Sequence, residues 1–109
     1  MTTEQVSTML GSLGIPTAYY QFPDTQQGPP FLCFFYGADN DALADNENYV
    51  KIDRLIVELY TETKDFDLEK ALETILAAHG LVWTKDTEQL DDEHMTEVVY
   101  EMDVIITED

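Results

Sequence analysis

The sequence predicts an α+β domain in which two helices pack on one face of a mainly antiparallel sheet of four to five strands. Three observations lead to this prediction. Two segments repeat apolar residues at helical spacing, the segment near the C-terminus alternates apolar and polar residues, and several links between elements have the length of hairpin turns. With 109 residues, the chain has room for one hydrophobic core, so we expect a single domain over residues 1–109.

The first element is a helix that starts near the N-terminus. Thr2 followed three residues later by Gln5 matches a capping box, in which each side chain satisfies a backbone N–H of the other residue. Apolar residues then recur on one helical face at Val6, Met9, Leu10 and Leu13. Gly14 and Pro16 follow in the order that ends helices.

The next segments predict two strands and two polar loops. A short strand over 18–20 leads into a loop over 22–30, where Pro29 and Pro30 exclude regular strand pairing. Residues 31–36 are apolar on both faces, which predicts a central or covered strand. Residues 37–48 are mainly Ala, Asp, Asn and Glu and predict an acidic loop.

A long strand rich in β-branched and aromatic residues is predicted over 49–61. Its alternation changes parity, since Val50 and Ile52 share one face while Leu55, Val57 and Leu59 share the other. A bulge near Asp53 and Arg54 would reconcile the two halves, because one extra residue reverses the facing of everything that follows it.

The second helix starts at Asp65 or Asp67, either of which can cap it, and ends at His79 and Gly80. Its predicted apolar stripe comprises Leu68, Ala71, Leu72, Ile75 and Leu76.

A strand over 81–84, a polar extension and turn over 85–93, and a closing strand over 95–106 complete the domain. In the closing strand one face is apolar, at Val98, Tyr100, Met102, Val104 and Ile106. We expect one core shared by the sheet and the second helix, built from Val57, Leu59, Leu72, Ile75, Tyr100 and Met102.

Charge excludes several functions. The chain has 23 Asp and Glu against 5 Lys and Arg, a net charge of −18. Phosphate neutralisation needs clustered cations, so we expect no sequence-specific nucleic-acid binding and no attraction to an anionic membrane. Cys33 is the only cysteine and lies in an apolar run, which indicates a buried hydrophobe. Residues 1–5 lack the pattern of a signal peptide, so we expect assembly in a host cytoplasm.

The sequence shows little that indicates catalysis, and we expect a protein that is not an enzyme, with no cofactor and no metal. One cysteine and two distant histidines cannot form a structural zinc site. His79 is placed to meet the negative end of a helix dipole, and His94 lies in a polar turn. Residues 39–50 resemble a calcium loop only superficially, because the turn glycine and the final acidic ligand are missing.

Short segments spread over most of the chain resemble a known family. They are Gly14-Ile15-Pro16, Ala18-Tyr19-Tyr20, residues 29–36, Ala44-Asp45-Asn46, residues 56–61, Lys64-Asp65, Glu93-His94-Met95 and Val99-Tyr100-Glu101. Together they resemble the small tail-terminator, or head–tail joining, proteins of long-tailed phages and prophages of Gram-positive bacteria.

The resemblance implies a virion tail protein that self-associates into a ring, commonly a hexamer, and contacts the major tail tube protein and the head-side connector protein. Long loops suit such contacts, so we expect interface residues at Pro29, Pro30, Asp39, Asp41 and Asp45. Glu97, Glu101 and Asp103 share one face of the closing strand and are candidates to face the channel, although that face is equally interpretable as the solvated side of the sheet.

Two other functions fit the same composition. An acidic DNA-mimic inhibitor would present carboxylates to a DNA-binding enzyme in place of phosphates and would need no ring. Another head–tail connector or a minor tail component would also be a small protein without catalytic motifs.

Overall fold

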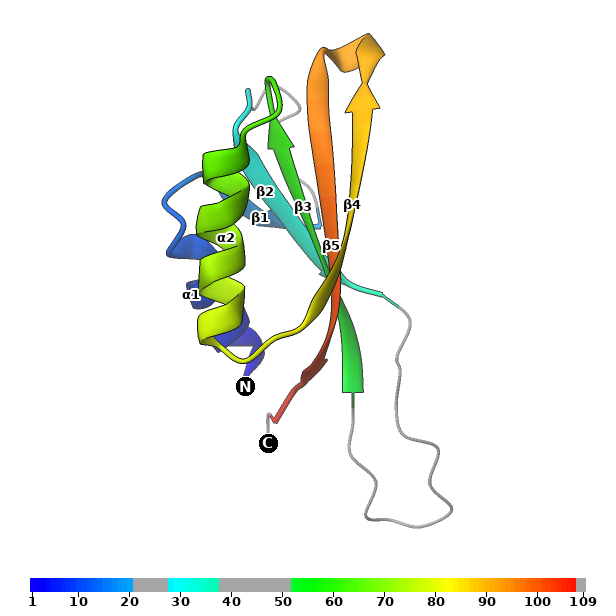
Figure 1. Ribbon diagram of the computed structural model, residues 1–109. Coiled ribbons are helices and arrows are strands. Elements are labelled where there is room, and N and C mark those ends of the chain that lie inside the picture. The colour runs from blue at the N-terminus through cyan, green and yellow to red at the C-terminus, as the bar shows by residue number, and fades with distance from the viewer. Residues whose placement is uncertain (21–27, 38–51, 108–109) are drawn as a thin grey trace.

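The computed structural model describes residues 1–20, 28–37 and 52–107. It confirms the α+β class, with two helices and five strands (Figure 1). The helices are α1 (Thr3–Gly11) and α2 (Phe66–Ala78). The strands are β1 (Thr17–Tyr19), β2 (Phe31–Tyr36), β3 (Ile52–Thr61), β4 (Trp83–Leu90) and β5 (Met95–Ile105).

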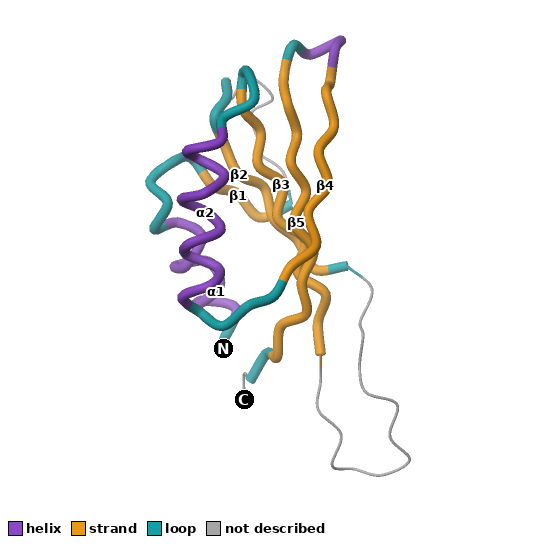
Figure 2. The backbone as a smooth tube through the Cα atoms, viewed as in Figure 1, coloured by secondary structure: helices purple, strands orange, loops and turns teal. Residues whose placement is uncertain are grey.

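The strands form one sheet in the order β1-β2-β3-β5-β4. β1 runs parallel to β2, and every other neighbouring pair is antiparallel. Both helices lie on the same side of this sheet, and no described element covers its other side (Figures 1 and 2). We refer to these two sides as the covered face and the uncovered face.

The helix ends follow the predicted capping. In α1 the Thr2 hydroxyl accepts a hydrogen bond from the Gln5 backbone at 3.1 Å, and Gln5 Oε1 accepts one from the Thr2 backbone at 2.8 Å. The start of α2, which the sequence left open, is capped by Asp65, whose Oδ1 accepts a hydrogen bond from the Leu68 backbone at 3.0 Å. His79 occupies the C-cap of α2, with Nδ1 2.9 Å from the Ile75 carbonyl oxygen.

One buried cluster fills the space between the helices and the covered face. Val6, Met9 and Leu10 of α1 meet the strands beside Leu72 and Leu76 of α2. Five of the six predicted core residues are buried, and Ile75 is partly buried against the cluster. Cys33 is also buried, although it lies outside this cluster on the uncovered face opposite Glu58, and its thiol pKa is raised by burial and then by the charge of Glu58. The alternation predicted for β5 is confirmed from Thr96 to Val104.

The predicted bulge in β3 is wrong. Each residue from Ile52 to Thr61 pairs with one residue of β5, from Ile105 to Thr96, without an insertion. Asp53 is buried on the covered face beside Leu55, while Ile52 lies on the uncovered face. The apparent change of parity arose because apolar residues occupy both faces and an acidic residue occupies a buried position.

Other boundaries and positions also differ from the prediction. The helix α1 ends at Gly11, so Leu13 lies outside it, and β4 begins at Trp83 rather than at residue 81. β4 continues through the segment predicted as a polar extension and ends at Leu90, since its hydrogen bonds to β5 hold a polar strand in place. Ala71 is exposed, so it lies outside the apolar stripe of α2. Tyr20 lies beyond β1 with a left-handed backbone, φ +72°.

Candidate functional site

The uncovered face contains the residues that the sequence analysis proposed for a channel. Glu97, Glu101 and Asp103 all project from this side of β5, because their neighbours Val98, Tyr100, Met102 and Val104 are buried on the other side. The structure therefore brings these three acidic residues onto one face. Its strands also place apolar residues there, with Phe35 opposite Ile56 and Val99 opposite Glu58.

Two carboxylates on the uncovered face share one tyrosine. The Tyr60 hydroxyl lies 2.6 Å from Glu97 Oε2 and 3.2 Å from Glu58 Oε1. A phenol has one proton, so it donates to one carboxylate at a time, and the shorter distance favours Glu97. The Tyr60 pKa is raised by burial and then by the hydrogen bond to Glu97, so this phenol stays protonated and acts as a donor.

The crowding of these groups changes the ionisation of Glu58. Its pKa is raised above the usual 4.5, first by burial and then by the charge of Glu97, although the hydrogen bond from Tyr60 opposes the rise. The ionised form of Glu58 is therefore less favourable in the folded chain than in the unfolded chain. Asp103, by contrast, has a cation beside it, with Arg54 Nε 3.3 Å from its Oδ1.

Replacing Glu58 with glutamine is expected to stabilise the fold at neutral pH by about 0.2–1 kcal/mol, the usual scale of cross-strand charge effects. Because the pKa of Glu58 is higher in the folded chain than in the unfolded chain, its protonated form stabilises the fold. This stabilisation is complete below the unfolded pKa near 4.5 and is lost as pH rises through the folded pKa. Glutamine resembles the protonated form and removes this loss. Urea unfolding from pH 4 to pH 8 checks it, with the exposed Glu62→Gln as control; equal stability changes in both variants at every pH would contradict the prediction.

A second charged cluster lies between α2 and β4, and the sequence analysis missed it. Glu69 is 1% exposed, with Lys64 Nζ 2.9 Å from Oε2 and Lys85 Nζ 2.8 Å from Oε1. The contact to Oε2 is an ion pair without hydrogen-bond geometry, whereas Lys64 donates a hydrogen bond to Oε1 at 3.0 Å.

Glu73 extends this cluster to Tyr100 of β5. Its Oε2 accepts hydrogen bonds from Lys85 at 2.7 Å and from the Tyr100 hydroxyl at 2.8 Å. Burial raises the Glu73 pKa, but these two donors outweigh it and hold the pKa below its usual range. The Lys85 pKa is lowered by burial and raised more strongly by Glu69 and Glu73. We therefore interpret the cluster as a clamp between helix and sheet. The sequence contained one indication that Glu69 is buried, because Glu69 shares the helical face of Leu72 and Leu76 at the period of the apolar stripe.

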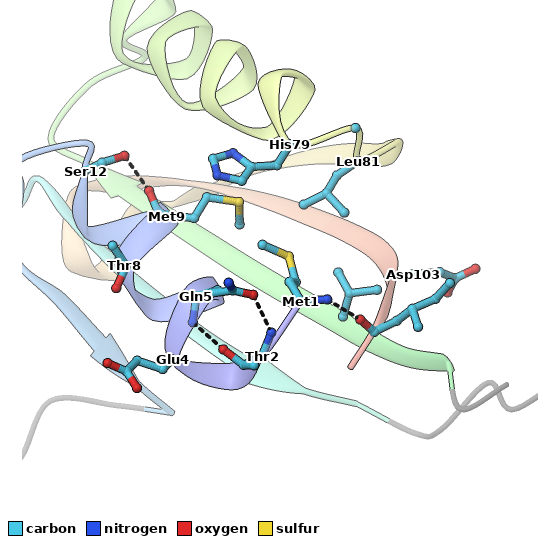
Figure 3. A pocket seen from close by; sticks show the side chains of 13 residues that line it. Met1, Thr2, Glu4, Gln5, Thr8, Met9, Ser12, His79, Leu81 and Asp103 are labelled. Atoms are coloured by element: carbon cyan, nitrogen blue, oxygen red, sulfur yellow. Dashed lines mark hydrogen bonds between the residues drawn. The ribbon is translucent and has the colours of Figure 1, made fainter. Parts of the chain in front are cut away.

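An open groove of about 950 Å³ lies between α1, the end of α2 and the end of β5 (Figure 3). Three of its polar side chains are engaged locally: Thr2 and Gln5 cap α1, and the Ser12 hydroxyl donates to the Met9 carbonyl at 2.6 Å. His79, whose Nδ1 contacts Ile75, also lines the groove. These side chains serve the ends of the helices rather than converging on a common point.

Of the residues predicted to form interfaces, two lie within the described part of the chain and three lie outside it. Pro29 is half-buried and Pro30 is exposed, directly before β2. Asp39, Asp41 and Asp45 lie outside the described residues. Within residues 1–20, 28–37 and 52–107, no three His, Cys, Asp or Glu side chains are grouped as metal ligands. Neither described helix has the length and hydrophobicity needed to span a membrane.

Comparison with known proteins identifies a structural relative but no sequence family. No protein-family model matches the chain, and no curated protein matches it. A chain in a solved structure described as "Virion of native gene transfer agent (GTA) particle" superposes with a TM-score of 0.55 at 14% sequence identity. The match covers 88% of this chain and 84% of the other. The two chains share a fold.

Proposed function

We propose that the chain is a structural protein of a virion. The observation that carries the proposal is the fold shared with a chain of the GTA virion, which extends over most of both chains. A match over 88% of this chain extends well beyond a single supersecondary motif. Several of the charged groups described above also have structural roles, since Lys85 pairs with Glu69 and Asp65 caps α2.

We further propose that the chain is a tail terminator, which the resemblance of its short sequence segments implies. In this role it forms a ring, most simply a hexamer, at the end of the tail tube, and it contacts the major tail tube protein and the head-side connector. The residues proposed for contacts with neighbouring subunits or proteins are Pro29, Pro30, Asp39, Asp41 and Asp45.

In the proposed ring the uncovered face lines the channel. Glu97 and Glu101 then give it a negative wall, along which DNA, also negative, passes without binding. The same face also argues for a virion role over DNA mimicry. A mimic needs carboxylates spaced like phosphates, whereas here Phe35, Ile56 and Val99 interrupt the acidic positions.

Electron microscopy of particles produced without this gene tests the proposal. The expected result is tails of abnormal length that are separated from heads, and a plasmid copy of the gene restores joined particles. Joined particles with normal tails would overturn both the terminator role and a connector role. Normal tails beside unfilled or unjoined heads would indicate another head–tail connector instead.

Assembly of the ring is expected to increase with ionic strength and with Mg²⁺, because every copy adds a charge of −18. Salt at 0.1 M screens charges beyond about 10 Å, a distance comparable to the spacing of side chains on adjoining subunits. Sedimentation velocity across NaCl and MgCl₂ series measures the change. A ring that forms best at low salt without divalent ions would contradict this expectation.

A further inference from the structure

One edge of the sheet is free of charge. β1 and β2 contain no Asp, Glu, Lys or Arg, whereas both helices and the other three strands contain charged residues. Among the described strands, β1 is the last on this side and pairs with β2 alone. In a chain with a net charge of −18, this edge differs in composition from the rest of the described structure.

Aromatic rings surround this uncharged edge. The Tyr19 ring lies 5.4 Å from the ring of Phe34 and 6.1 Å from that of Tyr36. The Tyr20 ring lies 6.2 Å from Tyr19 and 5.8 Å from Phe35. Yet Tyr19 and Tyr20 remain 55% and 67% exposed. Tyrosines are enriched in protein interfaces, and these two are exposed on or next to strands that contain no charged residue.

The backbone at Tyr20 is also unusual. Tyr20 has φ +72°, a left-handed conformation that a residue with a bulky side chain rarely adopts. Its N–H donates to the Phe34 carbonyl at 2.7 Å, which fixes the turn at the end of β1. Tyr20 therefore combines an exposed ring with an uncommon backbone conformation that is hydrogen-bonded to β2.

We propose that the uncharged edge, formed by Tyr19, Tyr20 and the adjoining rings of β2, is the surface through which one copy of the chain docks on a second copy. This inference rests on the proposed self-assembly and specifies where it occurs. The choice of partner follows from charge. A basic partner is attracted to the acidic uncovered face, whereas another copy with a charge of −18 is repelled there.

The chain also has few cations for salt bridges between copies. Of its 5 basic residues, Lys64 and Lys85 pair with Glu69, and Arg54 pairs with Asp103. An uncharged surface avoids opposing carboxylates whatever part of the next copy it meets. A ring needs contact between two different surfaces of the subunit, and an edge of this kind supplies one of them.

The test compares full-length variants by sedimentation velocity in the salt that best assembles the wild type. Tyr20→Glu places a carboxylate on the edge, and the double variant Tyr19→Ser, Tyr20→Ser removes the rings without adding charge. Val82→Glu is the matched control, because Val82 is 85% exposed and lies far from the edge in the sheet order, beside β4. Circular dichroism melting verifies that each variant is folded.

Both edge variants are expected to dissociate, with a dissociation constant at least about 30-fold higher, the effect of losing an interface hot spot. Val82→Glu is expected to assemble like the wild type. Assembly of both edge variants at wild-type strength would overturn the edge as the docking surface while leaving the proposed virion role intact. A wild-type chain that stays monomeric at every salt, yet is present in purified virions, would overturn the second copy as the partner.

Discussion

Truncating Leu72 to alanine is expected to lower the free energy of unfolding by about 2–5 kcal/mol. Leu72 is 0% exposed and lies where α2 meets the sheet, in the cluster that includes Val57, Leu59 and Tyr100. The variant loses the transfer free energy of the removed methyl groups, and the tightly paired strands limit how far the cavity can collapse. Urea unfolding followed by circular dichroism measures the change.

Leu68→Ala is the matched control for this substitution. It makes the same chemical change on the same helix, but Leu68 is partly buried at the edge of the cluster. We expect a clearly smaller loss, because fewer contacts are removed and water can fill the space. A loss below about 0.5 kcal/mol for Leu72→Ala would place Leu72 outside the core, since surface substitutions have effects of that size.

The parts of the fold that the sequence predicted are those determined by local chemistry. The capping box of α1 needs two side chains within one turn, and both hydrogen bonds are present. β5 alternates over its whole buried length because one face meets helices and the other does not. Periodicity records that difference directly, so the core residues of β5 could be identified from sequence.

The predictions from sequence were wrong or incomplete where long-range contacts determine the local structure. β4 is a polar strand with six exposed residues in succession, and its pairing with β5 rather than its composition makes it a strand. β1 is short and runs parallel to β2, an orientation that three residues cannot reveal. Asp53 occupies a buried strand position, which disrupted the apparent alternation and suggested a bulge that is absent.

The candidate surfaces were predictable only in part. Alternation placed Glu97, Glu101 and Asp103 on one face, but it could not show that Tyr60 joins Glu97 to Glu58 across two strands. The uncharged edge depends on sheet order, because the composition of β1 and β2 matters only once β1 is known to be an edge strand. The clamp at Glu69 joins residues from three elements and required the tertiary structure.

Replacing both Lys64 and Lys85 with methionine is expected to destabilise the fold by about 3–5 kcal/mol, the usual effect of leaving a buried charge without its partners. Glu69 is 1% exposed and makes its ion pairs with these two lysines at 2.9 and 2.8 Å. Without them, the carboxylate remains in a dry site between α2 and β4, or it takes up a proton. Urea unfolding at pH 7 measures the loss.

Replacing Glu69 instead of the two lysines is expected to have a smaller effect. The difference distinguishes the cost of an unpaired buried charge from that of a general packing defect. Glu69→Met leaves two lysines whose side chains are 33% and 34% exposed, so their ammonium groups can turn to water. The triple variant, with methionine at all three positions, removes the uncompensated charge and should recover most of the stability lost in the double variant. A triple variant as unstable as the double variant would show that lost packing, and not the stranded carboxylate, causes the destabilisation.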